Sequence, residues 1–480
     1  MSGMLKKLQT LSESDFYPYH MPGHKRNGSP DFSKDITEID GFDNLHHATG
    51  IIEKAQKRAA ELYGADESFF LVNGSTCGIL ATFFACFQRG DKILVARNCH
   101  KAVYHAIEIR GLRPIYVYPE IDEEYGISVG ITAKQVEEAI KQHEEYAQSS
   151  GLKYSVNEYF DRPRGMILTS PTYEGVTSEI KEIAELLHEQ DKFLIVDEAH
   201  GAHFGFHEAF PESAVTLGAD VVIQSLHKTL PSMTQTALLH WCSDRIPSDK
   251  IHKYLDIFQT SSPSYVFMAH MDECIGLLEK KGTKLFGQFA DRLENFYKRC
   301  EDLKHIKVRR NSDPGKIVIL ADCCTGRKLY DILRTRFHLQ FEMCAGNYVL
   351  GIMTICDTKD GYERLLDALF CLDDEFDGLS VDKTEDDKKM TLASLLKVRP
   401  EMLFRPGETD GRDFEAVSLS KAVGRMSGEY LYLYPPGIPF IVPGEIFSEE
   451  AVNGLKALRK MGYELQGMSD MSGKTVKVVV

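Results

Sequence analysis

Two short stretches of the sequence decide the predicted fold. Residues 193–200 read Phe-Leu-Ile-Val-Asp-Glu-Ala-His, and residues 221–228 read Val-Val-Ile-Gln-Ser-Leu-His-Lys. Each begins with a run that is apolar at nearly every position, as expected for a β-strand that is buried on both faces. Each ends in polar residues that can carry chemistry. Because ligands bind at the carboxyl ends of strands in open α/β sheets, these stretches predict a sheet with a site at its edge.

Five further apolar runs and several helical patterns surround these two stretches. The runs are Ser68–Val72, Lys92–Ala96, Pro114–Tyr118, Met166–Thr169 and Ala237–Trp241. The helical patterns between them are Thr76–Gln88, Ala102–Gly111 and Ser178–Gln190, and Ser178 is placed to be the N-cap of the last one. Alternating strands and helices predict an α/β domain with a mostly parallel, seven-stranded sheet.

The pattern changes after about residue 260. A long helix is predicted over Met271–Arg299. It is followed by a smaller α/β unit with strands at 317–320, near 340–344 and at 348–354, and with helices at 327–337 and 361–372. Residues 373–389 are acidic and predict an exposed connection. The last unit is predicted to contain a helix at 418–426, the proline-rich segment 434–445 and a closing helix at 448–461. The predicted division is therefore an N-terminal linker (1–35), a large domain (36–270), a small α/β domain with its connecting helix (271–375) and a C-terminal domain (390–480).

Composition excludes some classes of function. Among 480 residues, 56 Lys and Arg face 71 Asp and Glu, which gives a formal charge of −15. Nucleic-acid binding needs a basic surface, whereas a negative field attracts small cations. The sequence contains no run of about 18 apolar residues, so no membrane span is predicted. The polar start lacks the apolar core of a secretion signal, and the eleven cysteines include no CxxC pair, so we expect reduced thiols and a cytoplasmic protein.

Lys228 and Asp197 are the strongest chemical signals. A lysine at the end of a strand can form a Schiff base with an aldehyde when its neighbours lower its pKa. Asp197, about thirty residues earlier, can keep a pyridinium nitrogen protonated, so that the ring withdraws electrons. The alternatives are a surface lysine, an aspartate that caps a turn, or a divalent metal site formed by Asp197 with Glu198, His200 and His203.

Two weaker signals precede them in the chain. Asn73-Gly-Ser-Thr76 lies between a predicted strand and a helix, where amides and hydroxyls can bind a phosphate, although a simple N-cap needs no ligand. His100 ends another strand and can stack on an aromatic ring or move a proton. In chain order the four signals supply a phosphate site, a ring platform, an acid and a lysine, which together are what a pyridoxal phosphate site needs. A metal site would explain only residues 197–203.

These residues resemble a known family. The chain is similar to the bacterial Orn/Lys/Arg decarboxylases of the pyridoxal phosphate fold-type-I superfamily over about residues 16–470. Seven blocks carry the resemblance: Tyr19-His-Met-Pro-Gly-His-Lys25, Asp43-Asn-Leu-His46 with Gly50-Ile-Ile, Asn73-Gly-Ser-Thr76, Arg97-Asn-Cys-His-Lys101, Val196-Asp-Glu-Ala-His-Gly201, Ser225-Leu-His-Lys-Thr-Leu-Pro231, and Tyr434-Pro-Pro-Gly-Ile-Pro439 with Pro443-Gly-Glu445. The resemblance implies an aspartate-aminotransferase-like large domain, a smaller α/β domain and a C-terminal decarboxylase domain.

The resemblance also assigns roles to residues. It implies that Lys228 holds the cofactor aldehyde, that Asp197 pairs with the pyridine nitrogen and that His100 stacks on the ring. His200 is expected to contact the ring or its hydroxyl side. The residues expected to hold the phosphate are Ser75, Thr76, Ser225 and His227. The resemblance also implies a homodimer with shared active sites, in which Thr260, Ser261 or Ser262 contributes to the phosphate site of the partner subunit. Larger relatives carry an N-terminal wing domain that builds decamers, and this chain starts almost directly at the block before the large domain, so a dimer or a dimer of dimers is expected.

The implied activity is decarboxylation of a basic amino acid to agmatine or a diamine plus carbon dioxide. Arginine or lysine is expected ahead of ornithine. A cationic side chain needs a carboxylate partner when it is desolvated, and the candidates are Glu174 and Glu445. Lys228 or His227 is expected to return the proton to Cα. The alternatives are another fold-type-I enzyme, such as an aminotransferase or a lyase, and a catalytically silent polyamine-regulatory protein.

Overall fold

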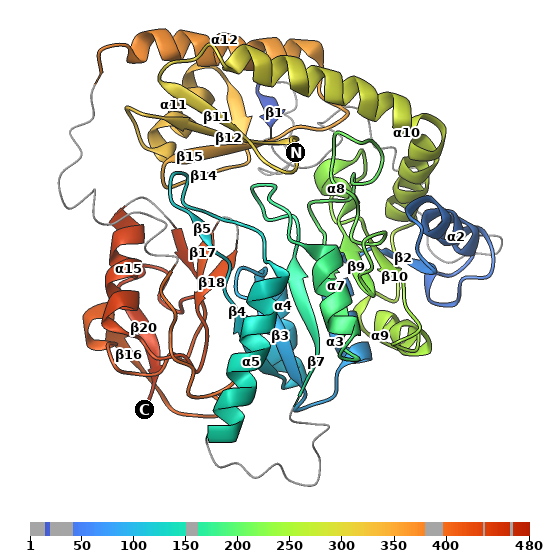
Figure 1. Ribbon diagram of the computed structural model, residues 1–480, viewed down its shortest axis with the longest axis vertical. Coiled ribbons are helices and arrows are strands. Elements are labelled where there is room, and N and C mark those ends of the chain that lie inside the picture. The colour runs from blue at the N-terminus through green and yellow to red at the C-terminus, as the bar shows by residue number, and fades with distance from the viewer. Residues whose placement is uncertain (1–14, 20–41, 150–161, 380–396, 435–436, 461–463) are drawn as a thin grey trace, which may run out of the picture.

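We describe the fold from a computed structural model of the chain. The structure describes residues 15–19, 42–149, 162–379, 397–434, 437–460 and 464–480. Three units are visible in Figure 1: a large unit around the main sheet, a small unit above it and a C-terminal unit beside it. Most of the predicted N-terminal linker and most of the block Tyr19–Lys25 lie outside the described residues.

A seven-stranded sheet forms the core of the large unit. Its spatial order is β2-β10-β9-β8-β7-β3-β4, and only β10 runs antiparallel to its neighbours. The strands are β2 (Glu67–Leu71), β3 (Lys92–Ala96), β4 (Arg113–Val117), β7 (Pro163–Thr169), β8 (Phe193–Asp197), β9 (Val221–Gln224) and β10 (Ala237–Trp241). The expected α/β fold with a mostly parallel sheet is confirmed by the strand pairings. The central strands are buried on both faces, whereas the edge strand β4 is only partly buried.

Helices cover this sheet. They include α3 (Gly74–Cys86), α4 (Lys101–Arg110), α5 (Ala133–Ser149), α7 (Ile180–His188) and α9 (Asp249–Phe258). Helix α3 packs so tightly that a Cβ on Gly78 would lie 2.6 Å from Leu71, so this position needs glycine. The prediction that Ser178 caps α7 is wrong, because Glu179 is the N-cap and the Ser178 hydroxyl accepts a hydrogen bond from the Ile131 amide instead.

Helix α10 (Tyr265–Cys300) links the large unit to the small one. It arches along the edge of the molecule to a four-stranded antiparallel sheet of order β11-β12-β15-β14 (Figure 1). These strands are β11 (Ile306–Arg310), β12 (Lys316–Ala321), β15 (Tyr348–Ile352) and β14 (Met343–Ala345). Helices α11 (Gly326–Arg336) and α12 (Lys359–Phe376) pack in the same unit, and β1 (Tyr17–Tyr19), inside the predicted linker, pairs with β13 (Leu339–Phe341).

The first residues of the predicted acidic connection belong to a helix. Helix α12 continues to Phe376, and Asp373 is buried. Its carboxylate accepts hydrogen bonds from the amides of Lys304, His305 and Ile306, at 2.7 to 2.9 Å. The prediction that residues 373–376 form an exposed connection is therefore wrong, because this carboxylate binds backbone amides at the start of β11.

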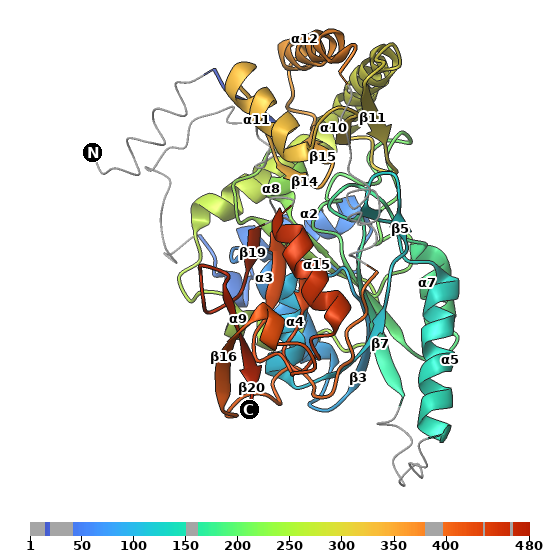
Figure 2. The ribbon, with the colours of Figure 1, turned by 90° about the vertical axis from the view of Figure 1, so that its left-hand side faces the viewer.

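The C-terminal unit packs against α4 and β4 of the large unit, as Figures 1 and 2 show from two sides. It contains β16 (Phe414–Ser418), β17 (Leu431–Tyr434), β18 (Ile438–Ile441), α15 (Glu449–Lys460), β19 (Glu464–Gln466) and β20 (Thr475–Val479). The predicted helix at 418–426 is wrong. Ser418 ends a strand paired with β20, only Leu419–Lys421 makes a short 3₁₀ turn, and Gly424 has a positive φ of 76° that ends regular structure.

No helix in the described part of the chain combines the length and the apolarity needed to cross a membrane.

Candidate active site

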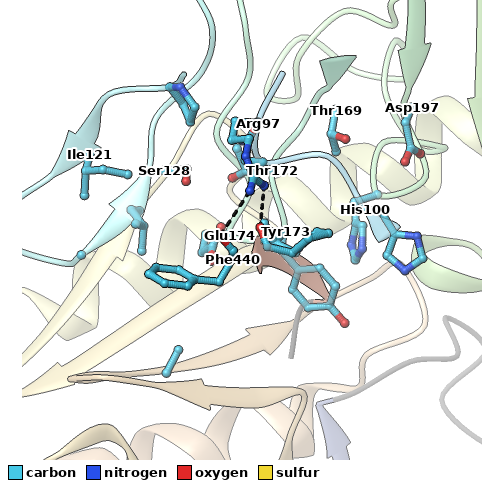
Figure 3. A pocket seen from close by; sticks show the side chains of 18 of the residues that line it. Arg97, His100, Ile121, Ser128, Thr169, Thr172, Tyr173, Glu174, Asp197 and Phe440 are labelled. Carbon is cyan, nitrogen blue, oxygen red and sulfur yellow. Dashed lines mark hydrogen bonds between the residues drawn. The ribbon is translucent and has the colours of Figure 1, made fainter. Parts of the chain in front are cut away.

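A cavity lies where the three units meet, at the carboxyl edge of the large sheet. Residues from the ends of β3, β7 and β8 form one wall, and the hairpin of β5 (Ile121–Asp122) and β6 (Ile127–Ser128) forms another. Ala345 and Tyr348 of the small unit and Ile438–Phe440 of the C-terminal unit close it. Figure 3 shows Arg97, Thr172, Glu174 and Phe440 grouped on one side of the cavity and Asp197 and His100 on the other. Ser75, His200 and Lys228 also line it.

Lys228 lies in the short helix α8 (Leu226–Thr229), directly after β9. Its Nζ is 3.0 Å from Nε2 of His200. Burial lowers the pKa of the Lys228 amine, against the opposing effects of the Asp197 and Glu342 carboxylates, and the Lys316 ammonium lowers the pKa further. A lysine with a lowered pKa holds more of the unprotonated amine, which is the form that reacts with an aldehyde.

Asp197 ends β8, and its carboxylate is buried beside the cavity. It accepts a hydrogen bond from the Ala199 amide at 3.2 Å. Burial raises the pKa of Asp197, whereas Lys228 acts in the opposite direction. A buried carboxylate is stabilised by a cationic partner, and a protonated ring nitrogen in the cavity would be such a partner.

Two histidines flank these groups in their neutral form. His100 is the N-cap of α4, where its Nδ1 accepts a hydrogen bond from the Ala102 amide at 3.2 Å, and burial lowers its pKa to about 3. Burial, followed by the charge of Lys228, lowers the pKa of His200 well below its usual range. The His200 ring also lies against the Tyr173 ring, with 4.3 Å between the ring centroids. Both histidines can therefore contact an aromatic ring without adding positive charge beside Lys228.

The predicted phosphate residues lie at two neighbouring chain turns. Ser75 and Thr76 are in the first turn of α3, where amide groups point outward from the helix; Ser75 lines the cavity and Thr76 is exposed. The Ser225 hydroxyl is fully buried and has no hydrogen-bond partner among the described residues. His227 Nδ1 lies 3.0 Å from the Thr236 carbonyl oxygen.

This arrangement fits pyridoxal phosphate. A buried hydroxyl without a partner is costly, and the phosphate of the cofactor would supply the missing acceptor for Ser225. The buried carboxylate of Asp197 and the pKa-lowered amine of Lys228 suit the ring nitrogen and the aldehyde of the same molecule.

The residues predicted to serve the partner subunit are exposed. Thr260, Ser261 and Ser262 follow α9 and do not line the cavity. The Thr260 amide donates a hydrogen bond to the side chain of Asn73, the N-cap of α3, at 3.1 Å. This exposed loop therefore lies beside the N-terminus of α3 in the same chain.

The two predicted substrate carboxylates differ in position. Glu174 lines the cavity, and its Oε1 accepts a hydrogen bond from the Tyr348 hydroxyl at 2.6 Å. Burial raises the pKa of Glu174. Glu445 is fully buried behind the cavity wall and does not line it; its carboxylate pairs with Arg97 at 3.2 Å. Arg97 also donates to the carbonyl oxygens of Pro439 (2.6 Å) and Phe440 (3.2 Å), and it lies near the centre of Figure 3.

The alternative metal site does not converge. The Glu198 carboxylate accepts hydrogen bonds from Ser213, Ala214 and Gln224, and His203 pairs with Asp313. Within the described part of the chain, no group of three His, Cys, Asp or Glu side chains is arranged to hold a metal ion.

Sequence reasoning missed several residues that line the cavity. Thr172 and Tyr173 stand next to Glu174, and Arg97 opens the block around His100, so their positions at strand ends could have singled them out. Tyr348 carries no such signal. It belongs to the small unit and meets Glu174 only through the packing of the two units.

Comparison with known proteins identifies the family of the chain. The family model of the Orn/Lys/Arg decarboxylase major domain matches residues 4–324, and the model of the C-terminal domain of the same family matches residues 393–476. An arginine decarboxylase of Bacillus subtilis is 32% identical over 96% of this chain and 94% of its own length. The lysine decarboxylase LdcA of Pseudomonas aeruginosa is 23% identical over 87% of this chain and 68% of its own length.

The fold is shared with solved structures. The crystal structure of the lysine decarboxylase LdcF of Francisella novicida superposes with a TM-score of 0.77 at 21% identity, and it covers 91% of this chain and 73% of the LdcF chain. The seven-stranded sheet, the lysine and aspartate at its carboxyl edge, and the matches to both domain models lead to one conclusion: the chain belongs to the Orn/Lys/Arg decarboxylase family, whose members use pyridoxal 5'-phosphate.

Proposed function

We propose that the chain decarboxylates a basic amino acid, with arginine as the first candidate, lysine as the second and ornithine as the third. The observation that carries this proposal is the position of Glu174. Its carboxylate is buried, lines the cavity and accepts a hydrogen bond from the Tyr348 hydroxyl. A cationic side chain of the substrate would give this carboxylate the charge partner that burial demands. The relative named arginine decarboxylase, which matches almost the whole chain, supports the order of candidates.

Different residues of the chain would bind different parts of the cofactor. Lys228 would hold the aldehyde carbon, Asp197 the ring nitrogen and His100 the ring face. Ser75, Thr76, Ser225 and His227 would hold the phosphate, and the exposed loop 260–262, with Ser261 at its centre, would contribute to the partner subunit's site in a homodimer. When it is bound, pyridoxal phosphate supplies a ring that accepts the electrons left behind as the α-carboxylate departs as carbon dioxide.

The protein contributes charge and proton control. The buried Asp197 carboxylate would stabilise positive charge on the ring nitrogen of the bound cofactor. A proton must then reach Cα of the product. Lys228 Nζ can hold it, since the neutral His200 ring lies 3.0 Å away and can accept a hydrogen bond from a protonated amine. His227 is the alternative donor.

Aminotransfer is disfavoured by the state of Arg97. Aminotransferases commonly clamp the substrate carboxylate with an arginine. Among the described residues that line the cavity, Arg97 is the arginine, and its guanidinium is committed to Glu445 and to the carbonyls of Pro439 and Phe440.

The test is carbon dioxide release from arginine, lysine and ornithine, each supplied alone to the enzyme loaded with pyridoxal phosphate. Release from arginine together with formation of agmatine is expected, and lysine is expected to react more slowly. Absence of release from all three amino acids would remove the proposal. The reduced cysteines predicted from the sequence support a cytoplasmic location, which fractionation of the producing cells would test.

A further inference from the structure

A cluster of buried charges lies beside the cavity, outside the residues assigned above. Lys316, the first residue of β12, is 1% exposed, and Asp313 is fully buried. The Lys316 ammonium is 3.1 Å from Asp313 Oδ2, and His203 Nε2 is 3.2 Å from Asp313 Oδ1. Charges buried this deeply are costly, so their presence next to a reactive site calls for a reason.

This cluster joins the small unit to two loops of the active site. The Lys316 ammonium donates a hydrogen bond to the backbone carbonyl of His200 at 3.2 Å. Its aliphatic stem packs on Gly175, which has a φ of +90°; a Cβ there would lie 2.7 Å from Lys316. The Asp313 amide bonds to the Gly175 carbonyl at 2.8 Å, next to the substrate candidate Glu174.

Lys316 is linked to the Lys228 amine through a single residue, His200. Lys316 holds the backbone of His200, and the His200 ring is 3.0 Å from Lys228 Nζ. The charged or titratable groups that face Lys228 come from several elements: Asp197, Glu342, Lys316, His200, His100 and His227. Within this set Lys316 is the other ammonium, and the two carboxylates oppose its effect on the Lys228 amine.

We propose that Lys316 is a positioning residue for the cofactor lysine: from the small unit, its ammonium fixes the His200 loop, and with it the His200 ring, against the Lys228 amine. The inference rests on the proposed role of Lys228. It also assigns the small unit a part in the chemistry of the large unit, because correct docking of β12 brings the Lys316 ammonium to the His200 carbonyl.

The test measures the Lys228 amine itself in the cofactor-free enzyme. Competitive acetylation over a range of pH, followed by mass spectrometry of the Lys228 peptide, gives the pKa of this amine. Lys316→Met is expected to raise that pKa by about one unit, so that reaction of the amine at pH 7 falls about tenfold. Lys316→Arg keeps the charge and is expected to stay close to wild type.

A second variant guards against misfolding. The double variant Lys316→Met/Asp313→Asn removes both charges, so no unpaired charge is left buried. Because it too lacks the hydrogen bond from residue 316 to the His200 carbonyl, it is expected to raise the Lys228 pKa as Lys316→Met does. Lys192→Met is the matched control: Lys192 is also buried, but it precedes β8 and so lies at the opposite edge of the sheet from Asp197, and its loss is expected to leave the Lys228 pKa unchanged.

The outcomes separate cleanly. A folded double variant with the wild-type pH profile of Lys228 acetylation would overturn the proposal and leave the cluster as a simple clamp between units. An equal shift in Lys192→Met would overturn it as well. Since acetylation does not depend on turnover, a failure of carbon dioxide release would affect the proposed function and not this result.

Discussion

Two buried ion pairs attach the smaller units to the same edge of the large sheet, and they differ in character. Arg97–Glu445 joins the C-terminal unit, and Lys316 bonded to Asp313 joins the small unit to the His200 loop. Burial raises the pKa of Glu445, and Arg97 only partly offsets this effect. Burial alone would also raise the pKa of Asp313, but Lys316 and His203 hold it below its usual range.

The difference follows from how each cation is shared. Arg97 distributes its donors over two backbone carbonyls, the Tyr104 hydroxyl and Glu445, so it acts mainly as a scaffold for the cavity wall. Asp313, in contrast, receives both Lys316 and His203. One pair therefore supports the cavity wall, whereas the other is the pair that we propose positions His200 against the Lys228 amine.

Breaking the Arg97 pair should have the largest effect on stability. Arg97→Met leaves the Glu445 carboxylate buried without its cation, and the free energy of unfolding is expected to fall by about 3–5 kcal/mol. The double variant Arg97→Met/Glu445→Gln should recover most of this loss. Chemical denaturation of both variants measures it, and a double variant no more stable than the single one would show that the pair itself is not the source of the loss.

Glu198 extends the comparison of the two ion pairs, because it is a buried carboxylate that accepts hydrogen bonds from neutral donors and has no cationic partner among them. Burial raises its pKa to about 7, against hydrogen bonds from Ala214, Gln224 and Ser213. The folded state therefore binds more protons than the unfolded state between about pH 4.5 and 7, and the free energy of unfolding should fall as pH rises through this window, by on the order of 3 kcal/mol.

The measurement is denaturation of the wild type and of Glu198→Gln at pH 5 and pH 8. The variant lacks this titrating group, so its loss of stability between the two pH values should be smaller than that of the wild type. Parallel pH profiles would mean that Glu198 does not titrate in this range.

Glu174 tests the cavity side of the comparison. Replacing it with glutamine removes the charge that would pair with the substrate side chain, and hydrogen bonds to charged groups contribute about 1.5–3 kcal/mol, so the KM for arginine should rise about tenfold to hundredfold. The kcat should change much less, because Glu174 is proposed to bind the substrate side chain and not the reacting atoms. An unchanged KM would exclude Glu174 from substrate binding.

Tyr348→Phe should give the smallest effect. It removes the hydroxyl that donates to Glu174 Oε1 and keeps the ring. This hydrogen bond orients Glu174 and does not contact the substrate, so only part of the about 1.5–3 kcal/mol of a hydrogen bond to a charged group should be lost from substrate binding, and the KM should rise by roughly threefold to tenfold. A KM increase as large as that of Glu174→Gln would mean that Tyr348 contacts the substrate directly.

The sequence predicted what depends on local pattern. The strands Lys92–Ala96, Val221–Gln224 and Ala237–Trp241 match their predicted bounds, because continuous apolar runs are typical of strands buried on both faces. The prediction at 418–426 failed because pairing with β20, far along the chain, holds Ser418 in a strand, and only the short 3₁₀ turn Leu419–Lys421 follows before Gly424 adopts a positive φ.

The site divides in the same way. Lys228, Asp197, His200 and His100 could be predicted because each stands at or just beyond the carboxyl end of a strand, and the structure brings all four to one cavity. The contacts of Tyr348 and Lys316 could not, since they form only when the small unit packs on the large one. Glu445 shows the limit of motif reasoning: an acid in a motif that resembles the family lies behind the cavity wall.

The central claim is that Lys228 carries the cofactor. The enzyme should be loaded with pyridoxal phosphate, reduced with borohydride, digested and mapped by mass spectrometry. We predict one phosphopyridoxyl adduct, on the peptide that contains Lys228, and its loss together with carbon dioxide release in Lys228→Ala. An adduct on Lys101 or Lys316, or one that survives in Lys228→Ala, would contradict the account.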